Sequence, residues 1–561
     1  MQRPVGTMSI EDLWYKHAII YCLDVETYLD ANGDGVGDFD GLRRRLDYLA
    51  GLGVTCLWLQ PFHESPNRDN GYDVADYYSV NSRYGTLGDY VAFMNEARAL
   101  GMRVIVDLVV SHTSIDHPWF QAARKDRKSP FRDWYVWSDE RPEDHDRGIV
   151  FPGAQQTNWT WDEVAGQFYF HRFYEFQADL NAWNPAVREE IQKIMGFWLE
   201  LGASGFRMDA VPFLIERKRA GFRGEKDYTL LQEMRDFLQW RRGDAILLAE
   251  ANVLAEESPH YFGETGDRLQ MMLNFPVNQR LFYALATADV EPLREALQDT
   301  RDPPQHAQWV QFLRSHDELD LGRLTELQRQ RTFEAFGPEP DHQIYDRGLR
   351  RRLAPMLHDD PRRLRLALSL LFALPGTPMI HYGDEIGIGE DLSLQEREAG
   401  RTPMQWSNDR HGGFSKAGET FRPVVSSGPF AYSQVNVARQ LRDRESLLNF
   451  VERTIRIRQQ CPAIGWGGYE VLHTETPEAL AILSTWRGVS VLTLHNFSPN
   501  AKTVDVRLKD ASGPLVSLFD DEALDAGESG GFTVDLSGYG FRWFNVGGAD
   551  LALEETRARP V

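Results

Sequence analysis

The stretch Gly205-Phe206-Arg207-Met208-Asp209-Ala210-Val211 places an arginine and an aspartate two residues apart at the end of a short apolar run. Two further apolar runs are followed by an acidic residue, at Glu250 and at Asp317. Short apolar runs that end in charge and alternate with helix-like segments are typical of buried parallel strands. We therefore expect these three carboxylates to meet at the carboxyl ends of strands in a closed barrel, the face on which such folds place their chemistry.

Eight strand-like runs separated by amphipathic segments predict an α/β fold, a (β/α)8 TIM barrel formed by residues 1–110 and 185–459. An insert after the third strand, residues 111–184, is rich in aromatic residues and is expected to form a lobe over the barrel. Short runs separated by turn residues predict a C-terminal antiparallel β-sandwich over residues 460–561. The predicted barrel strands are 18–25, 54–59, 103–109, 205–210, 246–251, 269–275, 309–316 and 378–382; the predicted barrel helices include 87–100, 185–201 and 361–373; the predicted sandwich strands are 469–474, 479–485, 489–496, 503–508, 531–536 and 540–546, with turns at 510–514 and 528–531.

Composition narrows the possible partners and compartments. The net charge of −22 would repel nucleic-acid phosphates, so no nucleic-acid partner is expected. Three cysteines cannot form a complete set of disulfides, and Cys22 and Cys56 lie in apolar runs that favour buried thiols. No apolar run approaches the roughly eighteen residues of a membrane span, and no secretory signal is visible. We expect a cytoplasmic protein without a membrane partner, and the sequence leaves both a monomer and a homo-oligomer open.

The three acidic strand ends suit the cleavage of a glycosidic bond. A retaining glycosidase needs one ionised carboxylate and one protonated carboxyl group about 5 Å apart. Arg207 lies two residues before Asp209, so its side chain points to the same side of the strand and can hold that carboxylate ionised. Glu250 has apolar neighbours in the sequence, and burial among them favours the neutral acid. Each acidic residue alone is as well explained by a structural salt bridge, and it is the set that predicts an enzyme acting on sugars.

Two histidines and a tyrosine near these strand ends extend the predicted site. His112 and His316 can donate hydrogen bonds to sugar hydroxyls while they remain mostly neutral near pH 7. A lone histidine is more often a polar core residue, but each of these lies beside an acidic strand end. Tyr72 offers a stacking face to a sugar ring, although packing alone would also explain it.

Five short segments carry a resemblance to a known family. Residues 107–112, 205–209, 248–250 and 315–317 resemble, in this order, the four signature regions of the α-amylase superfamily, the family 13 glycoside hydrolases, and residues 177–181 resemble its insert motif. The resemblance implies that Asp209 is the nucleophile, Glu250 the general acid/base and Asp317 a stabiliser that grips substrate hydroxyls. By the same resemblance, the site that holds the reacting glucose is lined by Asp73, His112, Arg207 and His316; Tyr72 is added to them for its stacking face.

Further segments are similar to one branch of that superfamily, the enzymes that interconvert maltose and trehalose. The likeness is carried by residues 117–124, 132–139, 171–174, 261–263 and 401–406. It implies a retaining α-glucosyl transfer through a covalent glucosyl-aspartate, with side hydrolysis, on a small-molecule α-glucoside. It also places Arg401 at the mouth of the pocket near the second sugar. Five aromatic residues of the insert form either a lid that excludes water or only a core: Trp119, Phe120, Trp134, Tyr135 and Trp137.

Several positions depart from that branch and keep alternatives open. Ser111 and Ser315 stand where asparagine is usual, Phe213 stands where tyrosine is common, and Gly322 stands where glutamate is common. The alternative enzyme is an α-glucosidase, an amylase-like hydrolase or a transglucosylase with a different acceptor. A catalytically silent sugar-binding protein is the alternative from another class, and the intact acidic trio argues against it.

The segment Asp30-Ala31-Asn32-Gly33-Asp34-Gly35-Val36-Gly37-Asp38 places oxygen ligands at alternate positions, with glycines between them. Hard oxygen donors at this spacing suit Ca²⁺. The segment resembles the start of an EF-hand loop and the metal loop of the oligo-1,6-glucosidase-like branch of the superfamily, whereas a solvated acidic turn is the simpler alternative. We expect a structural Ca²⁺ held by Asp30, Asn32, Asp34, the Val36 carbonyl and Asp38, with more effect on stability than on catalysis.

Overall fold

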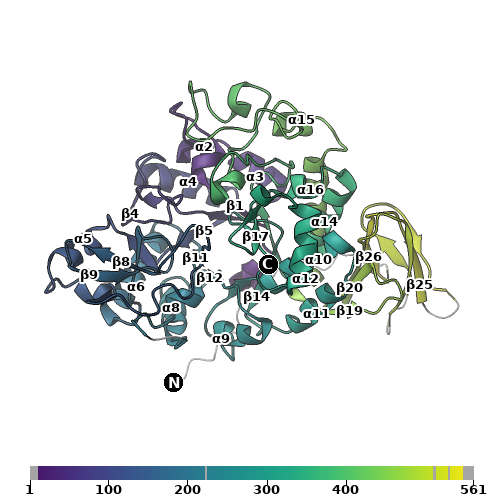
Figure 1. The fold of residues 1–561 in the computed structure, drawn as a ribbon. Coiled ribbons are helices and arrows are strands. Elements are labelled where there is room, and N and C mark those ends of the chain that lie inside the picture. Colours follow the sequence, from purple (N-terminus) through teal and green to yellow (C-terminus); the bar gives the residue numbers. More distant parts are fainter. Residues whose placement is uncertain (1–9, 222–223, 509–512, 528–530, 548–561) are drawn as a thin grey trace, which may run out of the picture.

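A closed barrel of eight parallel strands forms the centre of the chain (Figure 1), in a computed structural model that describes residues 10–221, 224–508, 513–527 and 531–547. Every predicted barrel strand is present, so the predicted α/β barrel is confirmed. In order around the barrel, the strands are β1 (Ile20–Leu23), β2 (Cys56–Leu59), β5 (Arg103–Leu108), β11 (Gly205–Met208), β12 (Ile246–Ala249), β13 (Met271–Leu273), β14 (Gln308–Phe312) and β18 (Thr377–His381), which pairs again with β1.

Side chains from alternate strand positions fill the barrel, as the two-residue period of a strand requires. This interior cluster includes Ile20 and Cys22 of β1, Cys56 and Trp58 of β2, and Ile105 of β5. Near the carboxyl ends of the strands, charged side chains replace the apolar ones. Asp107 on β5 and Arg207 on β11 are paired in register there. The three cysteines are free and buried, which confirms the prediction for Cys22 and Cys56.

Helices cover the outside of the barrel, and polar caps fix where several of them begin. Thr86 and Asp89 form a reciprocal capping box at the start of α4, and Asn184 and Asp360 cap α6 and α14 just before a proline. The three predicted helices are therefore confirmed. The helices of four or more residues around the barrel are α1 (Val25–Tyr28), α2 (Phe39–Arg43), α3 (Leu46–Leu52), α4 (Leu87–Ala99), α6 (Pro185–Glu200), α7 (Val211–Leu214), α8 (Thr229–Arg241), α9 (Ser258–Phe262), α10 (Phe275–Thr287), α11 (Glu291–Asp299), α12 (Glu326–Phe336), α13 (Leu353–Met356), α14 (Pro361–Ala373), α15 (Val437–Gln440), α16 (Leu447–Gln459) and α17 (Pro462–Trp466).

The insert after β5 folds into a lobe of two small sheets beside helix α5 (Pro118–Lys125). An antiparallel pair, β6 (His112–Ser114) with β10 (Gln177–Asp179), forms the base at which the chain leaves and re-enters the barrel. A three-stranded sheet orders β7 (Trp137–Ser138), β9 (Gln167–Phe170) and β8 (Trp159–Asp162). In Figure 1 the lobe and the C-terminal sheets lie at opposite ends of the molecule.

Two antiparallel sheets after α17 enclose an apolar core of their own. The outer face of the larger sheet packs on the barrel, where the Trp543 indole donates to the Ser369 hydroxyl over 3.0 Å and His495 lies 2.9 Å from the same hydroxyl. All six predicted sandwich strands are present, and the predicted turns at 510–514 and 528–531 lie largely outside the described residues. The larger sheet orders β19 (Gly468–Leu472), β20 (Ala479–Trp486), β21 (Val489–Asn496), β26 (Phe541–Val546), β23 (Leu515–Ser517) and β24 (Ala523–Leu524); the smaller pairs β22 (Lys502–Arg507) with β25 (Gly531–Leu536).

Two short hairpins complete the barrel's loops. Strand β3 (His63–Glu64) pairs with β4 (Asp76–Val80) after the second barrel strand, and β17 (Gly348–Leu349) pairs with both β15 (Leu319–Asp320) and β16 (Gln343–Ile344) after the seventh. Within the described ranges, no helix has the length and apolar character needed to cross a membrane.

Candidate active site

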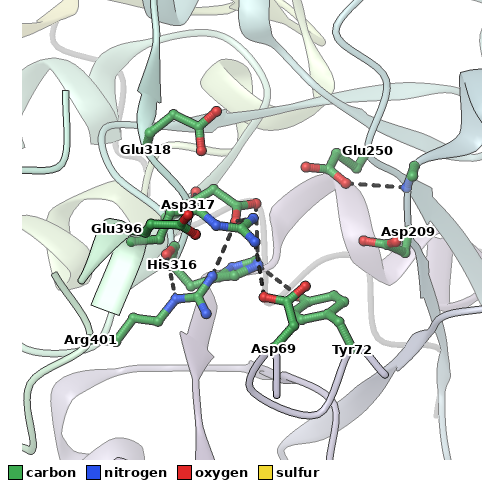
Figure 2. A network of polar contacts seen from close by, with 12 residues as sticks. Asp69, Tyr72, Asp209, Glu250, His316, Asp317, Glu318, Glu396 and Arg401 are labelled. Carbon is green, nitrogen blue, oxygen red and sulfur yellow. Dashed lines mark hydrogen bonds and ion pairs between the residues drawn. The ribbon is translucent and has the colours of Figure 1, made fainter. Parts of the chain in front are cut away.

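A pocket of about 600 Å³ opens at the carboxyl ends of the barrel strands. Asp209, Glu250 and Asp317 all line it, and they follow β11, β12 and β14 in the chain. Figure 2 shows their carboxyl groups around one common space. The three acidic strand ends therefore meet, as the apolar runs before them predict.

Arg207 is the hub of the acidic cluster. Its Nη1 lies 2.7 Å from Asp209 Oδ1 and 2.9 Å from Asp107 Oδ1, and its Nη2 lies 2.7 Å from Glu250 Oε2. One buried guanidinium thus touches three carboxylates, whereas the sequence predicts only its contact with Asp209. Because Asp209 and Glu250 bond to the two terminal nitrogens of the same group, their carboxyl groups are held side by side facing the pocket.

The turn after β11 helps to position the Asp209 and Glu250 carboxyl groups. Ala210 adopts a left-handed backbone conformation, with φ of 48°, which costs a residue other than glycine roughly 1–2 kcal/mol. In this conformation the Ala210 amide donates to Glu250 Oε2 over 3.2 Å. The strained residue therefore links the loop that carries Asp209 to the neighbouring acid, as is common at functional sites.

The two neighbouring carboxyl groups both hold a proton more tightly than a free carboxyl group. Burial raises the pKa of Glu250 to about 8; Arg207 opposes this shift, and the charge of Asp209 adds to it. Burial also raises the pKa of Asp209 to about 7, again against the pull of Arg207. Their mutual repulsion favours a single proton on the pair. That this proton belongs to Glu250 stays a prediction.

Asp317, on the opposite side of the pocket, stays ionised. Its Oδ1 lies 2.8 Å from Arg397 Nη1 and 3.3 Å from Arg401 Nη2. Burial alone would raise the pKa of Asp317, but the Arg397 and Arg401 guanidinium groups hold it well below its usual range. Arg397 Nη2 also lies 2.9 Å from Asp69 Oδ1. Asp69, Arg397 and Asp317 therefore form a chain of ion pairs on the side of the pocket opposite Asp209 and Glu250.

Tyr72, His112 and His316 form a wall of the pocket between Asp209 and Glu250 on one side and Asp317 on the other. The Tyr72 hydroxyl lies 2.6 Å from His316 Nε2, and the two rings stack with centroids 5.5 Å apart. His112 Nε2 lies 3.0 Å from the Tyr72 carbonyl. Burial lowers the pKa of both histidines, so they are neutral near pH 7 and can exchange hydrogen bonds with hydroxyl groups. All three residues line the pocket, as predicted.

Two predicted site residues lie outside the pocket lining, and a neighbour takes the place of each. Asp73 is fully buried and accepts from the Ser65 hydroxyl over 2.9 Å and from the amide of Arg68, so it braces a turn; Asp69 in that turn faces the pocket instead. Arg401 is buried behind Asp317, where its Nε donates to the His316 carbonyl over 2.8 Å. The predictions of Asp73 in the lining and of Arg401 at the mouth are therefore wrong.

Arg397 is the arginine that lines the pocket in place of Arg401. It comes from the 3₁₀ helix η5 (Glu396–Gly400), within a long irregular connection after β18. Sequence reasoning missed it because no strand end or motif precedes it. Asp107 was also missed, although it begins the signature segment 107–112; its register opposite Arg207 is seen only in the folded barrel.

The aromatic residues over the pocket are not the five that the insert's composition suggested. Those five pack on one another, with Trp119 and Trp134 centroids 4.7 Å apart and Phe120 and Tyr135 centroids 5.1 Å apart, and none of them lines the pocket. The lid interpretation is therefore wrong for these residues, which form the lobe's core. The pocket is lined instead by Phe151, Phe173 and Phe213.

The predicted metal loop has the right kind of donors but uses them for the loop's own backbone. Asp30 accepts from the amides of Gly33 and Gly35 over 2.6 and 2.8 Å. Asp38 accepts from the amides of Ala31 and Asn32 over 3.0 and 3.1 Å. Across the described residues, no group of three or more His, Cys, Asp or Glu side chains is placed to hold a metal ion. In this arrangement the residues do not form a ready Ca²⁺ cage, and the Ca²⁺ stays a prediction.

Comparison with known proteins places this geometry in a family. A model of the alpha amylase catalytic domain matches residues 24–334 and 350–467, and a model of the sucrose hydrolase-like C-terminal domain matches residues 488–545. Trehalose synthase of Pimelobacter sp. (strain R48) is 39% identical to the chain, over 98% of each. Trehalose synthase of Thermus thermophilus is 44% identical over 97% of this chain, and the chain covers 56% of that protein's length. Oligo-1,6-glucosidase of Bacillus cereus is 29% identical over 87% of this chain and 92% of its own.

Solved structures agree with these sequence relatives. A trehalulose synthase MutB mutant in complex with Tris superposes with a TM-score of 0.75 at 26% identity, covering 95% of this chain and 100% of that chain. A second MutB mutant, in complex with sucrose, gives a TM-score of 0.75 at 26% identity, covering 95% and 99%. The family model and these relatives thus cover most of the chain, including the barrel. The chain is therefore an enzyme of the α-amylase family, and it is similar to trehalose synthases over nearly its whole length.

Proposed function

We propose that the enzyme interconverts maltose and trehalose by retaining α-glucosyl transfer through a covalent glucosyl-Asp209 intermediate, with side hydrolysis. The observation that carries the proposal is the arrangement around Arg207, which holds the Asp209 and Glu250 carboxyl groups side by side at the pocket. The similarity to trehalose synthases supports the choice of substrates. The MutB structure with sucrose supports a small glucoside as the ligand class.

In the first step, an oxygen of Asp209 attacks C1 of the glucose that is held by the wall of Tyr72, His112 and His316. The bond from C1 to O4 of the second glucose breaks, and Glu250 gives its proton to that oxygen. Asp317, ionised opposite the acid pair, accepts hydrogen bonds from hydroxyls of the reacting glucose and stabilises the positive charge that develops at its ring.

In the second step, the released glucose turns within the pocket and presents its anomeric hydroxyl to C1. Glu250, now a carboxylate, takes the proton from that hydroxyl as its oxygen attacks C1 and the bond to Asp209 breaks. Two inversions at C1 restore the α configuration, and the product is trehalose. Attack by water in place of glucose gives two glucose molecules.

The pocket's aromatic cover is suited to keep water out between the two steps. Phe151 stacks with Tyr174 at 5.0 Å and with Tyr345 at 4.7 Å between ring centroids. The Arg397 guanidinium lies 4.8 Å from the Phe151 ring centre on the pocket side. Exclusion of water protects a reactive glycosyl-enzyme from hydrolysis, so this cover favours transfer over hydrolysis.

Product analysis on maltose tests the proposed function. Purified enzyme incubated with maltose is expected to form trehalose from the earliest times, with glucose as the minor product. Isotope-labelled glucose added to the mixture should enter trehalose only weakly, because the released sugar stays in the pocket. Glucose alone at early times would instead identify an α-glucosidase, and an oligosaccharide product would identify a different acceptor.

The pH profile of maltose conversion should be narrow. Asp209 must be ionised, so the rate is lost as the pH falls through about 7; Glu250 must be protonated, so the rate is lost as the pH rises through about 8. The value of kcat/KM is therefore expected to peak between about pH 7 and 8. A profile that is flat from pH 6 to pH 9 would contradict these protonation states.

We also propose that the loop from Asp30 to Asp38 takes up a structural Ca²⁺, once its side chains turn from the loop's amides toward the ion. Its oxygen donors and spacing support this. Ca²⁺ added to chelator-treated enzyme is expected to raise Tm by a few degrees and to change kcat little, because only the folded loop binds the ion. Asp34 is exposed, so Asp34→Ala should abolish the rise without disturbing the core. An equal rise in wild type and variant would assign the ion elsewhere.

A further inference from the structure

The rim of the pocket differs from its floor. At the floor, Tyr72, His316 and Asp209 are buried and surround the position of the reacting glucose. At the rim, Gly322 is exposed and the Arg347 side chain is 24% exposed, and both line the pocket. In a pocket closed at one end, the second sugar of a disaccharide lies on the rim side of the bond that is broken. The rim residues are therefore the ones that face the acceptor.

Arg347 ties three parts of the rim together. Its Nε lies 3.2 Å from Asp320 Oδ2 and its Nη2 lies 3.3 Å from Glu318 Oε1. Its Nη1 donates to the Val150 carbonyl of the inserted lobe over 2.7 Å. These bonds use three of its five N–H groups, so one hydrogen on each terminal nitrogen is left to face the pocket.

A strained hairpin carries Arg347 to this place. Tyr345 and Asp346, between β16 and β17, both have left-handed backbone conformations, with φ of 57° and 59°. Such residues normally cost free energy unless they are glycine, and they cluster at functional sites. The turn is therefore held in place by its surroundings, which include the bond from the Tyr345 hydroxyl to Glu396 over 3.0 Å.

Gly322 leaves the space that the Arg347 side chain occupies. A Cβ atom at position 322 would lie 3.1 Å from Arg347 Cδ and 3.0 Å from Asp320 Oδ1. Both distances are shorter than ordinary van der Waals contact, so a side chain at position 322 would require Arg347 or Asp320 to shift by a few tenths of an ångström. The glycine is needed for space, because its backbone conformation is one that other residues adopt.

We propose that Arg347 is a specificity-determining residue for the acceptor sugar, and that Gly322 is small so that Arg347 can reach it. The guanidinium hydrogens and the adjacent Glu318 carboxylate together offer donors and an acceptor, which match the paired hydroxyls of a free glucose. In Figure 2, Glu318 lies beside Asp317, away from Glu250 and Asp209. The inference rests on the proposed function, since it assigns the residue that holds the second glucose while that sugar turns.

Two substrates with the same donor half test the assignment. Maltose has a second sugar for Arg347 to bind, whereas p-nitrophenyl α-glucoside has a flat leaving group without such hydroxyls. Arg347→Met is expected to raise KM for maltose about tenfold, the effect of a lost charge-assisted hydrogen bond, and to change kcat/KM for the nitrophenyl substrate less than about twofold. Arg347→Lys keeps the charge without the planar fork and should recover only part of the maltose affinity.

Gly322→Ala is expected to raise KM for maltose in the same direction, because the added methyl group requires Arg347 or Asp320 to shift. Arg329→Met is the control, since that arginine pairs with Glu326 on α12, does not line the pocket and should leave the ratio of the two substrates unchanged. Equal losses on both substrates, or a Gly322→Ala enzyme with wild-type KM for maltose, would overturn the proposal. If wild type makes only glucose from maltose, the isomerase proposal fails, and the ratio of the two substrates still decides the role of Arg347.

Discussion

Replacement of Asp209 by alanine is expected to lower kcat on maltose by a factor on the order of 10⁵, because no other group is placed to form the covalent intermediate. Arg207 keeps Asp107 and Glu250 as partners in this variant, so the barrel should still fold and bind sugar. Steady-state kinetics and maltose binding by calorimetry measure the two effects separately. A variant that retains more than a few per cent of wild-type kcat would remove Asp209 from the role of nucleophile.

Azide sharpens this test. A small anion can enter the space that the Asp209 carboxylate leaves and attack C1 from the same side. Azide should therefore restore cleavage of an activated α-glucosyl donor in the Asp209→Ala enzyme and give the β-glucosyl azide. Formation of the α-glucosyl azide would instead show that a second protein nucleophile still acts.

Replacement of Glu250 by glutamine is expected to have the second largest effect, with a loss of about 10³-fold or more on maltose. Glutamine keeps the size of the side chain but cannot give a proton to the departing oxygen. The loss should shrink strongly for the first step on α-glucosyl fluoride, because fluoride leaves without protonation. The alkaline limb of the pH profile should also vanish, since burial places the pKa of Glu250 at about 8 in the wild type.

A matched control separates this chemistry from general damage. Glu385→Gln changes another buried carboxyl group, which bonds Tyr21 and Tyr48 and does not line the pocket. Any loss in this variant should be equal on maltose and on the fluoride, because Glu385 contacts neither half of the substrate. Equal losses on maltose and the fluoride in the Glu250→Gln enzyme would mean that Glu250 does not act as the acid.

The barrel could be predicted because its strands can be recognised in the sequence. Each is a short apolar run buried on both sides, and each of the three acidic residues follows such a run. The ends of the runs were harder to place: the predicted strand 309–316 stops at Phe312 in the structure, as the chain then leaves the barrel to carry Asp317 into the pocket. Strands β23 and β24 were missed, because three and two residues are too short to show an alternating pattern.

The site was predictable where a side chain follows a strand, and unpredictable where it depends on a turn. Asp69 and Asp73 lie in one turn, and the sequence does not show which carboxylate will satisfy the turn's own amides and which will face the pocket. Arg397 and Arg401 lie on one 3₁₀ helix and its end, and again packing decides which one reaches the pocket. Long-range partners such as Arg347 and Gly322 come together only through the folded chain.

Trapping of the glucosyl-enzyme tests the central claim most directly. The Glu250→Gln enzyme, treated with a 5-fluoro-α-glucosyl fluoride, should accumulate a covalent adduct, because the fluorine slows the second step and the missing base slows it further. Digestion and mass spectrometry are expected to find the added fluoroglucosyl mass on the peptide that contains Asp209. A label on any other residue, or turnover of the fluoride with no adduct at all, would contradict the mechanism.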